Sequence, residues 1–238
     1  MSAFQYVGQE LDVFAHARNW KRYWSSIIRP FIRGDVLEAG AGVGSNTSLL
    51  LIEDAVRSWT CLEPDPDLAL RLKASLEQNA KTVGCKVVVG TTRIFTRAPQ
   101  FDSIIYIDVL EHIQDDKQEL ESAADLLRKG GSLIVLSPAH QWLYTPFDEA
   151  IGHFRRYTRN TLRQCAPANC KLQQLRYLDS CGMLASLGNR VLLRQSQPSL
   201  EQIRFWDKYL VPFSTILDRV FRFRLGKSAL AIWQKTGG

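Results

Sequence analysis

Residues 36–44 read Val36-Leu37-Glu38-Ala39-Gly40-Ala41-Gly42-Val43-Gly44, and this stretch is the most specific structural signal in the chain. It joins the end of a predicted strand at 35–39 to a cluster of three glycines. A helix is expected to begin near 45–47, where Ser, Asn and Thr are all good helix caps. Glycines at such a turn let a ligand approach the backbone closely, because a Cβ would block its path. The stretch therefore predicts a cofactor-binding turn in an α/β domain.

Strand and helix patterns alternate along the chain after this turn. Strands are predicted at 35–39, 59–63, 86–90, 101–107 and 132–137, and helices at 68–81 and 115–129. We expect Asp67 to cap the first of these helices and Gly130-Gly131 to end the second. The alternation predicts a parallel sheet with helices on both faces.

Outside this core the regular alternation of strands and helices is lost. A helix is predicted at 8–28, a long loop at 138–157, a helix at 158–166, a strand at 172–178, an aromatic-rich helical stretch at 181–227 and a last strand at 229–234. We therefore expect one domain over 1–238. Its parts are an N-terminal helical cap (1–30), a cofactor-binding core (33–138) and elements on the side of a second substrate, the acceptor (139–238). The last part contains a helical insertion at about 181–227.

Composition excludes several classes of protein. Of 238 residues, 45% are hydrophobic and 23% charged, which is typical of a globular chain. The first twenty residues hold no secretory signal and no apolar run suggests a membrane span, so we expect a cytoplasmic protein. The five cysteines are scattered and form no C-x-x-C pair, so neither a zinc site nor a disulfide framework is indicated.

Charge is distributed unevenly. Residues 151–238 contain 15 Lys and Arg but 4 Asp and Glu, whereas residues 1–150 contain 15 and 20. The basic part is either a solvated face or a surface for an acidic partner, such as a phosphorylated small molecule, an anionic membrane or a nucleic acid. Aromatic and basic residues interleave in 181–227, and packing of helices on the domain accounts for most of these aromatics. Among functional interpretations we prefer a lid over a small or lipid-like substrate; a membrane-surface patch, a dimer contact and RNA stacking are the alternatives.

The details of the glycine stretch narrow the cofactor. No G-K-[ST] follows, which excludes a Walker phosphate loop, and Ser45 stands where a dinucleotide fingerprint has its third glycine. The pattern E-x-G-x-G-x-G resembles motif I of the class I S-adenosylmethionine-dependent methyltransferases, in the type 11/12-like small-molecule subgroup. Residues 62–65, 101–113 and 126–135 are similar to later motifs of that family, in the same order. The resemblance covers roughly residues 33–138.

This resemblance implies a doubly wound, mostly parallel seven-stranded sheet with a Rossmann-like methyltransferase fold, and S-adenosylmethionine as cofactor. Glu63 would accept two hydrogen bonds from the ribose diol. Thr91 stands near the place where many members carry an acidic residue toward the adenine. The residues expected to hold the cofactor are Glu38, Gly40, Ala41, Gly42, Gly44, Glu63, Pro64, Thr91, Asp108 and Val109.

The sequence Asp108-x-x-Glu111-His112 has three interpretations. His112 could be a general base, or the Glu-His pair could brace the pocket, or the three residues could bind a divalent metal together with His140 or His153. The metal pattern resembles members that methylate catechols or the 2′-hydroxyls of small RNAs. We expect no metal, and we place His153 ahead of His112 as the base because its loop follows the fifth strand, where acceptors enter.

Residues 144–157 resemble a stretch common in a methyltransferase subgroup associated with glycan, lipid and secondary-metabolite pathways. Arg155 and Arg156 could hold an anionic acceptor. Alternatively an arginine pairs with Asp148 or Glu149 to order the loop, and Tyr157 packs beneath it. The expected acceptor-binding residues are His140, Tyr144, Arg155, Arg156 and Tyr157.

The sequence thus predicts transfer of a methyl group to an oxygen or nitrogen of a small-molecule acceptor, with His153, His112 and Asp108 as catalytic residues. The alternatives are a metal-dependent 2′-hydroxyl or catechol methyltransferase and a non-catalytic cofactor-binding scaffold, which the intact glycine loop and Glu63 disfavour. Ser45 disfavours a nicotinamide-dependent reductase. No DNA partner is expected and RNA is disfavoured; a peripheral membrane contact and a homodimer stay open.

Overall fold

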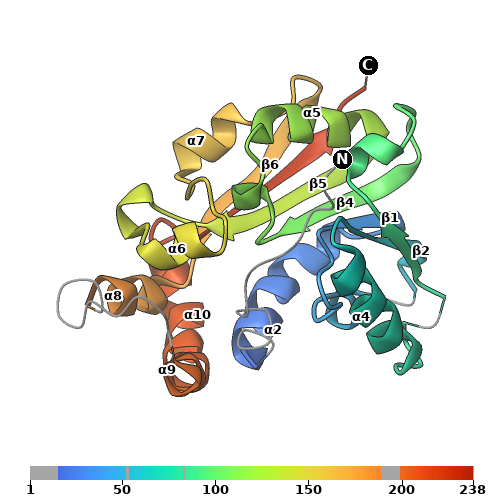
Figure 1. Cartoon of the computed structure of the whole chain (residues 1–238). Helices are drawn as coiled ribbons and strands as arrows, with labels where there is room; N and C mark the ends of the chain where they lie inside the picture. The colour runs from blue at the N-terminus through green and yellow to red at the C-terminus, as the bar shows by residue number, and fades with distance from the viewer. Residues whose placement is uncertain (1–15, 52–53, 83, 189–198, 238) are drawn as a thin grey trace.

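The computed structural model describes residues 16–51, 54–82, 84–188 and 199–237. Seven strands form one sheet in the order β3-β2-β1-β4-β5-β7-β6 (Figure 1). Their bounds are β1 (Gly34–Ala39), β2 (Val56–Glu63), β3 (Lys86–Val89), β4 (Phe101–Ile107), β5 (Leu127–Pro138), β6 (Cys170–Leu178) and β7 (Ser228–Lys235). β7 runs antiparallel to both β5 and β6, and the other pairs are parallel. The expected doubly wound, mostly parallel sheet is confirmed.

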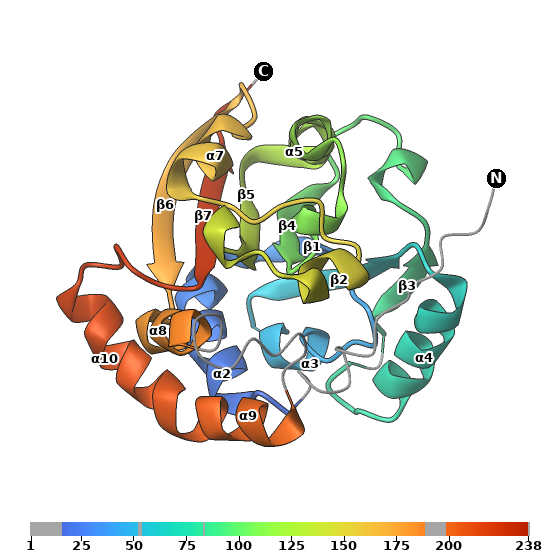
Figure 2. The ribbon, with the colours of Figure 1, turned by 60° about the vertical axis from the view of Figure 1, so that its left-hand side comes forward.

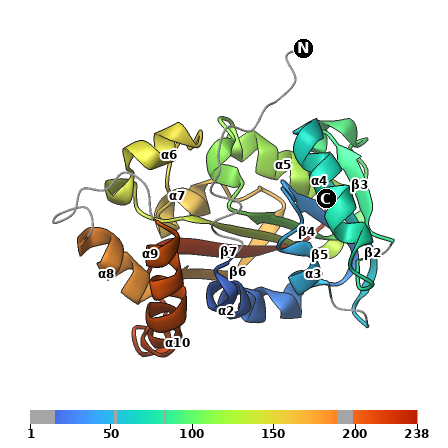
Figure 3. The same ribbon diagram turned by 60° about the horizontal axis from the view of Figure 1, so that its bottom comes forward.

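Helices cover both faces of the sheet, so the central strands β1, β4 and β5 are largely buried on both sides (Figure 3). The helices are α2 (Arg18–Ile28), α3 (Thr47–Leu50), α4 (Pro66–Glu77), α5 (Asp116–Leu126), α6 (Pro146–Ala150), α7 (Arg159–Gln164), α8 (Ser180–Gly188), α9 (Leu200–Phe205) and α10 (Val211–Val220). One core cluster lies under α2, with Trp24, Ile28 and Ile134 in it. The second lies under α5, where Leu120 and Leu126 pack against Tyr106.

Two predicted helix ends are wrong. α4 begins at Pro66, and its cap is Asp65, whose Oδ1 accepts the amides of Asp67 (2.8 Å) and Leu68 (3.1 Å). Asp67 therefore lies inside the first turn. α5 ends at Leu126 and β5 begins at the next residue, so Gly130-Gly131 lie within the strand.

The glycine pair has a packing role in β5 instead. A Cβ on Gly131 would lie 2.9 Å from the carbonyl oxygen of Arg128 and 3.0 Å from that of Asp102. The pairing register between β4 and β5 shifts at this point, between Phe101 and Ser103. A glycine is needed here because two backbones approach closely.

The segments outside the core match the predictions in part. The helix predicted at 8–28 is α2 from Arg18 onward, and residues 8–15 lie outside the described residues. The loop predicted at 138–157 contains the short 3-10 helix η4 (Gln141–Leu143) and α6. The insertion is helical in α8, α9, the π-helical turn η6 (Trp206–Leu210) and α10, although residues 221–227 are not helical and 189–198 lie outside the described residues.

The helices of the insertion are fastened to the N-terminal helix. Asp207 accepts the backbone amides of Asn19 (3.1 Å) and Trp20 (2.8 Å) at the start of α2. Asp218 in α10 accepts the Tyr23 hydroxyl at 2.8 Å and the Asp179 amide at 2.7 Å. These buried bonds place α9 and α10 alongside α2, at one side of the carboxyl edge of the sheet (Figure 2).

Candidate active site

The glycine loop follows β1 and has a left-handed backbone at all three glycines, with φ of 65° at Gly40, 56° at Gly42 and 79° at Gly44. A Cβ on Gly40 would lie 2.5 Å from Cγ2 of Val109, which follows β4. The loop therefore needs glycine for both its conformation and its close approach to Val109. Residues 40 and 109, which are expected to hold the cofactor, are neighbours in the fold.

Glu63, at the end of β2, fixes the glycine loop. Its Oε2 accepts the Gly42 amide at 2.8 Å and its Oε1 accepts the Asp65 amide at 3.0 Å. Burial raises the pKa of Glu63, and the two backbone hydrogen bonds oppose the rise. Since a carboxylate oxygen can accept more than one hydrogen bond, the carboxylate retains acceptor capacity for a ribose diol. The contact between Glu63 and a ribose stays a prediction. In the structure Glu63 is only 4% exposed.

Glu38 is buried beneath the same loop. Its Oε2 accepts the Thr47 hydroxyl at 2.7 Å and the Trp59 indole N–H at 2.9 Å. Burial raises the pKa of Glu38 to about 7, and these hydrogen bonds and the charge of Lys21 oppose the rise. Glu38 thereby links the loop to α3 and β2.

The other expected cofactor residues lie around this turn. The amide of Ala41 donates to the Leu62 carbonyl at 3.1 Å, which joins the loop to the end of β2. Pro64 is half-buried after β2, and Thr91 is exposed just after β3. The carboxyl ends of β1, β2 and β3 therefore gather these residues at one edge of the sheet.

Asp108 follows β4 in a left-handed conformation, with φ of 54°. Its side chain is solvent-exposed, yet the surrounding protein limits hydration of the carboxylate and raises its pKa to about 6. The charges of His153, Lys227 and Lys21 oppose that rise. Sequence reasoning missed Lys21 and Lys227, because only the docking of α2 and the turn before β7 bring them near Asp108.

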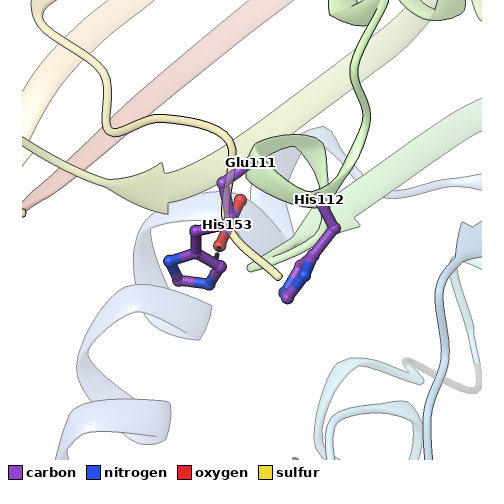
Figure 4. A group of neighbouring side chains, drawn as sticks. All are labelled: Glu111, His112 and His153. Carbon is purple, nitrogen blue, oxygen red and sulfur yellow. Dashed lines mark ion pairs between the residues drawn. The ribbon is translucent and has the colours of Figure 1, made fainter. Parts of the chain in front are cut away.

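Three titratable side chains meet beside the carboxyl end of β4 (Figure 4). Glu111 and His112 come from the 3-10 helix η3 (Leu110–His112), and His153 comes from the loop after α6. Each offers an atom within 4.8 Å of the others. The rings of His112 and His153 meet edge to face with centroids 4.5 Å apart. The sequence-predicted His153 and His112 are therefore brought together.

Glu111 is fully buried, and neither of its carboxyl oxygens has a hydrogen-bond partner. Burial raises its pKa well above the ordinary value, and the nearby charge of Asp108 adds to the rise. His153 Nε2 lies 3.9 Å from Glu111 Oε1. Burial, with the charge of His153, lowers the pKa of His112 to about 4, so His112 is neutral at neutral pH.

Asp148 orients His153. Its Oδ1 lies 2.8 Å from His153 Nδ1, and both of its oxygens accept from Arg156, at 2.8 and 2.9 Å. Burial would raise the pKa of Asp148, but the bonds from His153, Arg156 and Thr145 hold it well below its usual range. Because Asp148 is a carboxylate and can only accept, Nδ1 of His153 carries a proton, and Nε2 is the nitrogen that can serve as the base.

The expected acceptor residues have mostly internal partners. Arg156 pairs with Asp148, as the loop-ordering alternative predicts, and Arg155 Nη1 lies 2.7 Å from Asp116. Tyr157 is buried and its hydroxyl donates to Asp116 at 2.7 Å, so it packs beneath the loop.

Tyr144 and His140 also make contacts that stabilise the loop carrying His153. The Tyr144 hydroxyl donates to the His153 carbonyl at 2.6 Å. His140, with φ of 67°, has its Nε2 3.1 Å from the Gly226 carbonyl and its ring against Tyr177. These contacts hold the segment that carries His153, and acceptor contact by any of the five residues stays a prediction.

A family model described as a methyltransferase domain matches residues 14–180 of the chain. A search of the curated proteins finds no match. Among solved structures, the N-methyltransferase NodS from Bradyrhizobium japonicum is 14% identical, with a TM-score of 0.56 over 94% of this chain and 97% of that one. Coclaurine N-methyltransferase is 10% identical, with a TM-score of 0.62 over 92% and 72%. The [4+2]-cyclase SpnF is 12% identical, with a TM-score of 0.62 over 98% and 96%.

The structural likenesses establish the fold, and the family model covers more than half of the chain. The seven-stranded, mostly parallel sheet with helices on both faces agrees with that fold. The chain therefore belongs to the methyltransferase-domain family and is a class I S-adenosylmethionine-dependent methyltransferase.

Proposed function

We propose that this methyltransferase acts on an oxygen or nitrogen atom of a small-molecule acceptor, with His153 as the base. The carrying observation is the hydrogen bond between Asp148 and His153 Nδ1, which leaves Nε2, 3.9 Å from Glu111 Oε1, as the nitrogen for proton transfer. When bound, S-adenosylmethionine supplies a methyl group already activated as a sulfonium, so the protein has to orient the nucleophile and exclude water. His153 Nε2 takes the proton that the acceptor loses as its bond to the methyl carbon forms.

His112, the other histidine of the cluster, is a poor base near neutral pH. A group with a pKa of about 4 accepts protons poorly near neutral pH, which supports a bracing role for His112. Asp108, with a pKa of about 6, is positioned to orient the acceptor or the cofactor between the glycine loop and His153. The residues that would hold the cofactor are the glycine loop, Glu63 and Val109.

The acceptor side is lined in part by the helical insertion. A cavity of about 620 Å³ lies between α8 and α9, with Ala185, Trp206 and Lys227 in its lining. The charge of Lys227 in this lining also opposes the rise in the pKa of Asp108. The mixed lining supports the lid interpretation and an acceptor with both apolar and polar parts. Two of the compared structures are N-methyltransferases, which favours nitrogen among the acceptor atoms to be screened first.

The test starts with calorimetric binding of S-adenosylhomocysteine, which needs no acceptor. Formation of that product is then measured over panels of amines, phenols and hydroxy acids. With an active acceptor, His153→Ala is expected to lower kcat by roughly 10²–10⁴-fold without changing cofactor affinity. His16→Ala is the matched control, since His16 is exposed outside the cluster. Unchanged kcat in His153→Ala would reject His153 as the base.

The metal-dependent reading is the second candidate, and one observation favours it. His112, His153 and Glu111 offer two imidazoles and one buried carboxylate, which are ligand types used for divalent transition metals. Neither carboxyl oxygen of Glu111 has a hydrogen-bond partner. The raised pKa of Glu111 opposes this reading, because a metal ligand must give up its proton. We expect full turnover after exhaustive chelation. Loss of turnover with EDTA that Mn²⁺ or Mg²⁺ restores, together with equal damage from Glu111→Gln and His112→Ala, would establish the metal reading instead.

A further inference from the structure

The outer face of α9–α10 carries a row of large apolar side chains. Residues 200–220 form one continuous helical rod through α9, η6 and α10, along the rim of the molecule (Figure 2). Its row consists of Phe205, Tyr209, Phe213, Ile216 and Val220, each between 48% and 67% exposed. The steps of three and four residues place all five on one side of a helix. We call this set the outer row.

The inner face of the same rod packs on the domain. Buried there in the core are Ile203, Trp206 and Val211. Asp207 and Asp218 are also buried and accept hydrogen bonds from α2 and from the start of α8. The rod therefore has a buried face of its own. Packing within the domain does not account for the outer row beyond Phe205, which also lines the cavity between α8 and α9.

Exposed charges beside the outer row are almost all positive. The exposed cations of the segment 199–227 are Arg204, Lys208, Arg219, Arg222 and Arg224. Its one exposed acidic residue is Glu201. Apolar side chains flanked by Lys and Arg are the composition of a helix that lies in the interface of an anionic membrane.

We propose that α9–α10 docks this enzyme on the surface of an anionic lipid membrane, with the outer row in the acyl boundary and the cations at the phosphates. A second copy of the chain is a poorer occupant, because two such faces would bring like charges together. RNA is a poorer occupant too, since Ile216 and Val220 offer bases no stacking surface. Among the described residues no helix is long and apolar enough to cross a membrane, so the contact is peripheral.

The experiment is co-sedimentation of the full chain with vesicles of one part phosphatidylglycerol to two parts phosphatidylcholine, compared with phosphatidylcholine alone. We expect binding to the anionic vesicles that weakens with added salt. Phe213→Ser with Ile216→Ser should reduce the partition coefficient at least about tenfold, because both apolar side chains leave the interface. Arg204→Gln should reduce it about fivefold.

The matched controls lie on α4, which packs against β2 and β3 at the far edge of the sheet from β6. Leu70→Ser removes an aliphatic side chain that is 69% exposed, and Lys73→Gln removes an exposed cation. Neither should change binding by more than about twofold. Circular dichroism confirms that each variant is folded.

Three results would overturn the proposal. The first is no binding of the folded wild type to anionic vesicles at low salt. The second is equal loss in the α4 controls. The third is loss of a dimer, seen by analytical ultracentrifugation, or of RNA binding in the outer-row variants while vesicle binding stays intact. Because the assay needs no acceptor or turnover, its failure leaves the proposed catalytic function untouched.

Discussion

Glu38 is a buried carboxyl group whose protonation changes within an accessible pH range. Burial raises its pKa to about 7, so the folded state binds a proton that the unfolded chain releases near its ordinary value. The stability that Glu38 contributes is fully present below the unfolded pKa and is lost as pH rises through about 7. The difference corresponds to about 3 kcal/mol.

We therefore expect Glu38→Gln to flatten part of the pH dependence of unfolding. From pH 5 to pH 8, wild type should lose more of its free energy of unfolding than the variant, by up to about 3 kcal/mol. Urea denaturation at both pH values measures this. Glu77→Gln, an exposed carboxyl at the end of α4, is the control and should follow wild type. Parallel curves for all three proteins would refute the account of Glu38.

A substitution at Gly40 tests the role of the glycine loop. Gly40→Ala would force an L side chain into φ of 65° and against Val109. We expect S-adenosylhomocysteine affinity to fall at least about tenfold, with stability lower by about 1–2 kcal/mol. Gly84→Ala is a matched control, since Gly84 has φ of 97° and nothing within 4 Å of its added Cβ. It should keep full affinity; calorimetry with both variants separates backbone strain from damage to the site.

The segment from α6 to the start of α7 acts as one element around Asp148. The Asp148 carboxylate accepts hydrogen bonds from Thr145, His153 and Arg156, so this one side chain fixes both ends of the loop. Asp148→Asn keeps the size of the side chain but removes the charge that pairs Arg156 and selects the tautomer of His153. Activity should fall at least about a hundredfold in kcat, with faster amide exchange over 145–156.

Glu149→Gln is the control for this element, because Glu149 is the exposed neighbour of Asp148. It should retain activity and exchange rates. A variant Asp148→Asn with normal kcat but faster exchange would mean that the pair only orders the loop and does not set the base.

At the scale of the whole molecule, the C-terminal helices close against the N-terminal helix. Asp207→Ala would leave the half-buried amide of Asn19 and the buried amide of Trp20 without their acceptor. We expect a loss of about 2–6 kcal/mol in the free energy of unfolding, from roughly 1–3 kcal/mol for each stranded amide. Glu201→Ala, an exposed acidic residue of α9, should stay within about 0.5 kcal/mol of wild type in the same urea titration. Equal stability of the two variants would show that the α2 contact is weak.

The α/β fold, the cofactor turn and most strand positions could be predicted from the sequence. These features are local: a glycine turn, an apolar run and a carboxylate at a strand end each occupy a few consecutive residues. Helix ends were predicted less well. Asp65 and Asp67 are two nearby residues that can each satisfy the orphan backbone amides at the start of α4, and the structure uses Asp65. Gly130, expected to end α5, lies within β5.

Which side chains share the catalytic edge could not be predicted from the sequence and depends on how the chain packs in three dimensions. Glu111 and His153 follow different strands, and their approach depends on how the loop after β5 folds back over η3. Likewise, the sequence could not tell which face of α9–α10 is buried, since both faces contain aromatic residues. The inward side was decided by the buried hydrogen bonds of Asp207 and Asp218, which form only when distant segments of the chain pack together.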